Sequence, residues 1–336
     1  MTCLAALAAD QKPTPEATKR AIEQSQMTLP GSHQFHLKAK VVEATNLEND
    51  DYKAEIEEYW SAPSKWRRTV KTASFSQTLT VNGDKVREDL SGDYYPNWLR
   101  TMVNAIFDPG APWQGVDLSK SSDNPMIGGT QVCRRFAFRA GIPPVGNNVF
   151  STFCLERGLI ASVGKPGYHA EYKSYKKFAG KQVARKIREY IEPGTELEAS
   201  VEELTELDAP DESLFSVQEP NEQLETIAVS EETLRGIGVN MPPMEWPTIR
   251  GGKSSGVLSI YVCIDRKGRV RETYALNSDH PEMSDAARKQ VMNWEFKPTA
   301  NKGASVQIEA ILTFAYETKV QANAGASLGR LGSLSQ

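Results

Sequence analysis

Alternation of hydrophobic and polar residues dominates the first two thirds of the chain. Phe35, Leu37, Ala39 and Val41 are separated by the polar residues His36, Lys38 and Lys40. A period of two places one set of side chains on each face, which predicts a β-strand with one buried face. Comparable patterns predict further strands at residues 52–57, 66–70, 74–81, 130–139, 148–156, 159–163, 170–178, 181–191 and 196–204.

Two segments in the same region are instead typical of helices. Thr14 and Pro15 suit the start of a helix over residues 14–27, as cap and first helical residue. Residues 97–107 have apolar side chains at helical spacing, and Asp108-Pro109-Gly110 ends that pattern. The sequence therefore predicts an α+β domain over residues 10–206, a mostly antiparallel curved sheet (a half-barrel) with one or two helices.

An acidic, proline-bearing segment at residues 207–225 separates this domain from the rest of the chain. Few of its side chains are expected to be buried, so it is interpreted as an exposed linker. Residues 319–336 are rich in Gly, Ser and Ala and are expected to be a disordered tail.

The segment between them, residues 226–318, predicts a small β-β-α-β module. Residues 256–265 favour a strand, the turn Asp265-Arg-Lys-Gly268 follows, and residues 269–275 return as its partner. Ser284 is expected to cap a helix, because apolar residues follow it at helical spacing, and Pro298 stops the chain from continuing that helix. A last strand over residues 306–316 would point Ile308, Ala310, Leu312 and Phe314 inward.

This order of features resembles the TonB C-terminal domain family. The shared features are Trp246-Pro247, Gly256, Asp265-x-x-Gly268 with Val270, Ala286-Ala287, Trp294-x-Phe296-x-Pro298, Gly303 and Phe314. The resemblance implies that the module binds an extended peptide of an envelope partner by strand addition. The residues expected to contact that partner are Trp246, Pro247, Ile308, Ala310 and Leu312, for which a role in the core or in a turn is the alternative.

Two departures from that family bear on its transport function. The chain as given has neither an N-terminal membrane helix nor a long Pro-rich spacer, and Asn277-Ser-Asp-His-Pro281 stands where the family often has a Ser-Gly pair. Coupling to an inner-membrane motor is therefore not expected, although a part in TonB-type transport stays open.

A weaker resemblance concerns the first domain. The turn Phe178-Ala-Gly-Lys181 between two long strands, with the opening helix and the strand series, is similar to the LolA-like periplasmic lipoprotein carriers. The resemblance implies a curved sheet around a hydrophobic cavity for lipid or acyl chains. Trp60, Trp66, Trp98 and Phe107 would line such a cavity, and a filled core is the alternative.

Composition is that of a soluble globular protein. Hydrophobic residues make up 39% and charged residues 24% of the 336 residues, and the net charge of −4 does not favour a nucleic-acid partner. No apolar run is long enough for a transmembrane helix. Residues 1–9 resemble the end of a signal peptide, with a frayed terminus as the alternative, so export to the periplasm or cell envelope is expected.

The cysteines are consistent with export. Cys133 and Cys154 are equidistant from a predicted hairpin turn at Pro143-Pro144, so they would lie opposite each other on paired strands. A disulfide would form in an oxidising compartment, and two small buried residues are the alternative.

No pattern in the sequence predicts catalysis. Gly252-Lys-Ser-Ser-Gly256 has the letters of a nucleophile elbow, but a strand follows it where that motif needs a helix. His33 and His36 would point to opposite faces of a strand, which does not suit a metal site. The chain is expected to be a non-enzymatic envelope protein without cofactor or metal, acting through its peptide-binding module or, alternatively, as a lipid or lipoprotein carrier.

Overall fold

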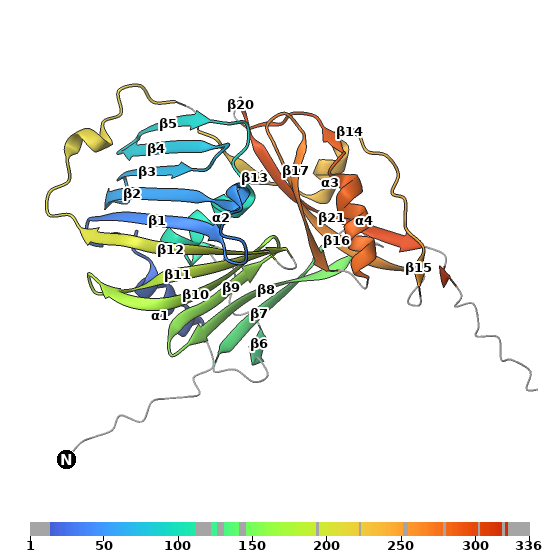
Figure 1. Ribbon diagram of the computed structural model, residues 1–336, viewed down its shortest axis with the longest axis horizontal. Helices are drawn as coiled ribbons and strands as arrows, with labels where there is room; N and C mark the ends of the chain where they lie inside the picture. The colour runs from blue at the N-terminus through green and yellow to red at the C-terminus, as the bar shows by residue number, and fades with distance from the viewer. Residues whose placement is uncertain are drawn as a thin grey trace, which may run out of the picture.

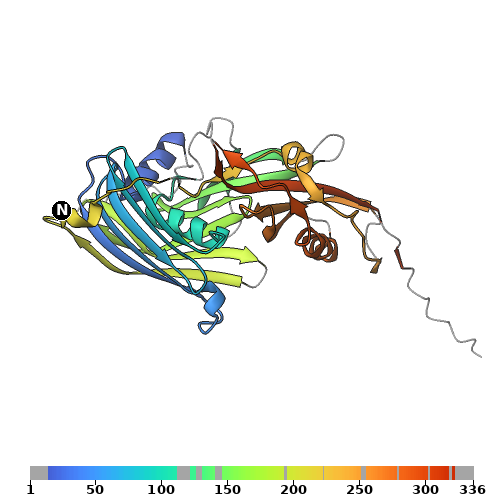
Figure 2. The same ribbon diagram turned by 90° about the horizontal axis from the view of Figure 1, so that it is seen from above.

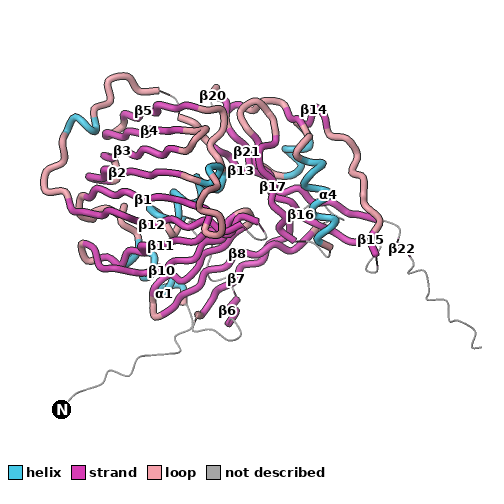
Figure 3. Tube along the Cα trace, viewed as in Figure 1, coloured by secondary structure: helices cyan, strands magenta, loops and turns pink. Residues whose placement is uncertain are grey.

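Two β-sheets form the framework of the described chain (Figure 1). The computed structural model describes residues 14–111, 122–125, 131–140, 146–192, 195–221, 223–250, 255–277, 280–301, 303–317 and 320–321. Strands far outnumber helical segments in this part of the chain (Figure 3). No helix among these residues is long and apolar enough to cross a membrane.

The larger sheet is antiparallel and strongly curved, and it is not closed into a barrel (Figure 2). Its strand order is β5-β4-β3-β2-β1-β12-β11-β10-β9-β8-β7-β6, so each strand pairs with its neighbour in sequence except where β1 meets β12. The strands are β1 (Phe35–Glu43), β2 (Ala54–Ala62), β3 (Lys65–Lys71), β4 (Ser76–Asn82), β5 (Lys85–Ser91), β6 (Ser122–Pro125), β7 (Val132–Ala140), β8 (Asn147–Glu156), β9 (Leu159–Lys165), β10 (Tyr168–Phe178), β11 (Lys181–Glu192) and β12 (Thr195–Glu206).

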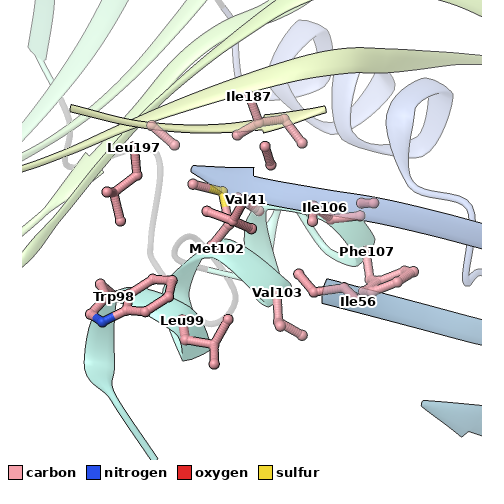
Figure 4. Close-up of a cluster of buried hydrophobic side chains, with 14 of the residues drawn as sticks. Val41, Ile56, Trp98, Leu99, Met102, Val103, Ile106, Phe107, Ile187 and Leu197 are labelled. Atoms are coloured by element: carbon pink, nitrogen blue, oxygen red, sulfur yellow. The ribbon is translucent and has the colours of Figure 1, made fainter. Parts of the chain in front are cut away.

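Two helices pack on this sheet, as the sequence predicts. Helix α1 (Pro15–Ser25) begins at Thr14, whose side chain accepts a hydrogen bond from the Ala17 amide. Helix α2 (Asn97–Phe107) lies against the curved sheet (Figure 4). Its apolar side chains share one core with residues such as Val41, Ile56, Ile187 and Leu197 of the sheet.

The predicted linker is not uniformly exposed. It contains a short 3-10 turn, η4 (Glu212–Phe215), and a second such turn, η1 (Asp50–Tyr52), precedes β2. Phe215 and Val217 are buried, with Lys65 lying over the Phe215 ring, and they are the buried residues among those described in a segment that is otherwise exposed or half-buried. Asn221 exchanges hydrogen bonds with the backbone of Glu88, which ties the segment to β5.

The smaller sheet has the order β13-β21-β16-β17 and carries helix α4 on one face. It is formed by β13 (Thr226–Ala228), β16 (Ser255–Ile264), β17 (Val270–Asn277) and β21 (Gln307–Glu317). Helix α3 (Glu231–Gly236) follows β13, and α4 (Pro281–Val291) lies between β17 and β21. Short pairings complete the module: β14 (Gly238–Asn240) with β18 (Glu295–Phe296), β15 (Ile249–Arg250) with β22 (Val320–Gln321), and β19 (Ala300–Asn301) with β20 (Ala304–Ser305).

The start of α4 differs from the prediction. His280 is the N-cap and Pro281 the first helical residue, whereas Ser284 lies inside the helix and is buried. The proline ring presets the dihedral angle of the first helical position, which explains why the helix begins one turn earlier.

The predicted disulfide is confirmed. Cys133 and Cys154 are directly opposite in the pairing of β7 with β8 and are bonded to each other. Both side chains are buried, so the second interpretation, that of small core residues, describes their environment as well. The Pro143-Pro144 turn, residues 1–9 and residues 252–254 of the Gly252–Gly256 motif lie outside the described residues.

Replacing both cysteines by serine (C133S/C154S) should lower the free energy of unfolding by about 3 kcal/mol. The bond spans 21 residues, and its loss restores that loop's entropy to the unfolded chain. Denaturant unfolding measures the effect, and added reductant should destabilise the wild type without changing the double variant. Equal midpoints for the two proteins would contradict the prediction.

Candidate partner-binding site

Both faces of the C-terminal sheet are covered by other parts of the chain. Along β16, Leu258, Ile260 and Val262 point into the core beneath α4, whereas Tyr261 and Cys263 belong to the core of the N-terminal domain. Successive residues of a strand point to opposite faces, so the buried run in β16 reflects cover on both sides. The module is therefore joined to the N-terminal domain through this second face, around Tyr261, Cys263 and Tyr274.

A half-buried ion pair lies at the centre of this junction. Arg100 of α2 pairs with Glu309 of β21, and the Tyr261 hydroxyl donates a hydrogen bond of 2.6 Å to the same carboxylate. Burial by itself would raise the pKa of Glu309, but Arg100 and Tyr261 hold it below its ordinary value. Glu309 is therefore ionised, and in turn it raises the pKa of Arg100 despite burial.

Two further contacts tie the start of α2 to the module. Gln307 of β21 accepts a hydrogen bond from the Tyr95 amide at 2.8 Å and donates one to its carbonyl at 3.2 Å. Glu272 of β17 accepts from the Asn97 amide at 2.7 Å. Since Pro96 at the N-cap offers no side-chain acceptor, a carboxylate from the other domain satisfies the first helical amide of α2.

Removing the guanidinium with Arg100→Met should lower the free energy of unfolding by about 1–3 kcal/mol at neutral pH, because the half-buried Glu309 carboxylate loses its cation. Because the pKa of Glu309 is lower in the folded protein than in the unfolded chain, its ionised form stabilises the fold at pH values above the ordinary carboxyl pKa. This contribution is lost as the pH falls through the folded-state pKa. The difference between the variant and the wild type should therefore shrink in acid.

Arg87→Met is the matched control, since Arg87 pairs with Asp89 at the surface. Its effect should stay below about 1 kcal/mol. Equal losses for the two variants, measured by denaturant unfolding across pH, would contradict the ion pair's role.

The outer edge of β21, the last long strand, is already occupied. Strand β13 pairs with its first part in parallel register, Thr226 facing Gln307 and Ala228 facing Glu309. Beyond β13, two side chains of α3 replace a strand: Glu231 accepts from the Thr313 amide at 3.1 Å, and Arg235 donates to the Thr313 carbonyl at 3.2 Å. Much of the edge predicted to bind a partner is thus paired within the chain.

The opposite edge, formed by β17, has no strand beside it within the described residues. The amide and carbonyl of Thr313 point away from β16, so its partner Ser259 directs its own backbone groups toward β17. Tyr261, two residues further along β16, does the same, and its partner Tyr274 bonds back to it. Thr273 and Ala275 therefore direct their amides and carbonyls away from the sheet. Arg288 of α4 donates to the Thr273 carbonyl at 3.1 Å.

A cleft of about 650 Å³ runs along this edge between the two domains. Tyr52, Tyr94, Trp98 and Tyr274 contribute aromatic surface to it, and Arg271 and Arg288 contribute positive charge. Neither arginine was predicted from the sequence as a site residue. The continuous apolar run of β16 indicates a sheet that is covered on both faces, and this was the sign in the sequence that the module packs against another part of the chain.

The residues predicted to contact a partner lie in two places. Ile308, Ala310 and Leu312 are buried beneath α4. Trp246 is half-buried and packs on Phe314 and Tyr316, with ring centroids 6.4 and 5.7 Å apart. Pro247 follows it and is also half-buried.

The aromatic residues predicted to line a lipid cavity belong to the core around α2. Trp60 stacks on Phe35 at 5.5 Å, and Phe107 lies under Arg68. Trp66 is half-buried against the same core, and Trp98 borders the interdomain cleft.

The predicted turn at Asp265–Gly268 is confirmed, and it depends on the missing side chain of the glycine. Gly268 has φ +81°, and an added Cβ would lie 1.9 Å from the Phe296 carbonyl oxygen. The buried Asp265 carboxylate accepts from the amides of Lys267 and Arg269 and pairs with Arg269 and Arg271.

Gly268→Ala should therefore lower the free energy of unfolding by about 3 kcal/mol or more, through backbone strain and displacement of β18. Gly83→Ala is the control, because Gly83 also has positive φ (+68°) but has no atoms near an added Cβ. It should cost only about 1–2 kcal/mol of strain. Thermal and denaturant unfolding of both variants test this, and equal losses would contradict the close approach.

The fold is a small four-stranded module attached to a larger curved-sheet domain. Residues 250–318 match the family described as Gram-negative bacterial TonB protein C-terminal, which confirms the resemblance inferred from the sequence. This similarity supports placing the chain among proteins of the cell envelope. No curated protein matches the chain.

Several solved structures share a remote likeness with the larger part of the chain. A LolA superfamily protein from Nitrosomonas europaea is 10% identical, with 60% of this chain and 96% of that one covered and a TM-score of 0.35. A putative outer membrane lipoprotein-sorting protein domain from Vibrio parahaemolyticus is 10% identical, covering 60% and 94%, with a TM-score of 0.30. A DUF1329 family protein from Desulfovibrio piger is 7% identical, covering 61% and 98%, with a TM-score of 0.32. Nothing about ligands follows from likenesses this remote.

Proposed function

We propose that this chain is a non-enzymatic protein of the cell envelope that binds an extended peptide by strand addition to the free edge of β17. The observation that carries the proposal is the edge of β17, which pairs with no strand among the described residues and runs into the cleft at Thr273, whose carbonyl accepts a hydrogen bond from the Arg288 side chain. An edge strand of this kind is a template for pairing with another chain. Both domains contribute to the cleft, so the N-terminal domain is part of the binding site.

The edge of β21, the last long strand, already pairs with an extended segment of the chain itself. Its edge is completed by β13 and by the Glu231 and Arg235 side chains, which shows that an extended segment fits beside this sheet. Since that edge is engaged within the chain, a partner is expected at β17 rather than at β21.

A carrier role has less support from the contacts. It would require space where α2 now packs its apolar face against the curved sheet (Figure 4). Lipid binding through Trp60, Trp66, Trp98 and Phe107 stays a prediction from the sequence.

The proposal predicts that a random heptapeptide library selected on the full chain yields peptides that depend on the β17 edge. Ala275→Pro should weaken them about tenfold or more, because proline removes an outward amide and blocks about two main-chain hydrogen bonds. Fluorescence polarisation with labelled peptides measures the dissociation constants.

Ala315→Pro is the matched control. Ala315 is also an exposed alanine whose amide faces outward, but it lies on the β21 edge. It should leave the affinities unchanged, provided that both variants unfold near the wild-type midpoint. Loss of binding in Ala315→Pro alone would move the site to the last strand, and a selection without β17-dependent binders would contradict the proposal.

A further inference from the structure

The cleft beside β17 has two chemically different walls. One wall is aromatic and comes mainly from the N-terminal domain: Tyr52 and Trp98 meet edge to face with ring centroids 5.6 Å apart, and Tyr94 lies beside them. Tyr274 extends this wall from β17, on the face that packs against the N-terminal core. Apolar side chains of a ligand would bury their surface here.

The other wall is cationic. Thr273 lies on the face of β17 opposite Tyr274, and Arg271 lies beside it at the bulge between Glu272 and Val270. Arg271 lies over the Tyr94 ring at 5.2 Å and pairs with Asp265 at 3.3 Å, with 39% of its side chain still exposed. Arg288 reaches the same place from α4, where it bonds the Thr273 carbonyl.

Carboxylates near the cleft do not cancel this asymmetry. Glu272 lies on the aromatic side, where it already accepts hydrogen bonds from the Asn97 amide and the Tyr274 hydroxyl. Asp51 borders the aromatic wall, and Asp285 lies 3.9 Å from Arg288 and is largely exposed. Arg288 thus lies on the α4 side of β17 and the aromatic groups lie mainly on the other side, whereas Arg271 reaches the Tyr94 ring where the two walls meet.

A strand added to β17 would continue its pleat, so alternate side chains of the ligand would face the two walls. We infer that the ligand is an extended segment in which acidic side chains alternate with aromatic or aliphatic ones. This inference rests on the strand addition proposed above and adds the chemical class of the partner. Acidic side chains would pair with Arg271 and Arg288, and apolar ones would pack on Tyr52, Tyr94 and Trp98.

Three labelled hexapeptides test the inference on the full chain. The first alternates Glu and Phe, the second alternates Lys and Phe, and the third has three Glu followed by three Phe. The first should bind about tenfold more tightly than each of the others, and its affinity should fall with added salt. Arg271→Met and Arg288→Met should each weaken it about fivefold or more.

Lys289→Met is the matched control, since Lys289 is the exposed neighbour of Arg288 on α4. It removes the same charge outside the cleft and should leave the affinity unchanged. If the Glu and Lys peptides bind equally well and both lose affinity in Ala275→Pro, the charge preference is overturned. Strand addition to β17 would still hold in that case. Failure of all three peptides at millimolar concentration would overturn the inference, whereas the library selection separately decides strand addition.

Discussion

The half-buried pair between Arg100 and Glu309 holds the two domains together at the centre of their junction. A four-stranded sheet with a single helix has one face left to cover, and in this chain the N-terminal domain covers it. Charges in such a place are stable only when they are paired and hydrogen-bonded, which Arg100, Glu309 and the Tyr261 hydroxyl achieve together. The same three groups lie on α2, β21 and β16, so the junction, the helix and the module are interdependent.

This junction determines which surfaces remain for a partner. One face of the small sheet packs under α4, the other packs on the larger sheet, and the β21 edge is engaged by β13 and α3. The β17 edge is left, and the same packing places Tyr52, Tyr94 and Trp98 beside it. The N-terminal domain therefore stabilises the module and also forms one wall of its cleft.

Local features were predictable from the sequence because their causes are local. The residues from Asn97 to Phe107 form the expected helix, Gly268 turns the chain where a left-handed residue is required, and the spacing of Cys133 and Cys154 about a turn gives their register. Contacts between distant segments were not predictable. Gln307 and Tyr95 are 212 residues apart, and nothing in either neighbourhood indicates that they exchange hydrogen bonds. Phe215 looked like part of an exposed acidic segment, and only the folded sheet shows the surface that buries it.

Residue-resolved amide hydrogen exchange on the full chain tests the arrangement most directly. The amides of Thr273 and Ala275 should exchange much faster than those of Glu272 and Tyr274, which bond to β16. The Thr313 amide on the other edge should be protected, because Glu231 accepts its hydrogen bond. Protection of Thr273 and Ala275 equal to that of Glu272 and Tyr274, or rapid exchange at Thr313, would contradict a module whose open edge is β17.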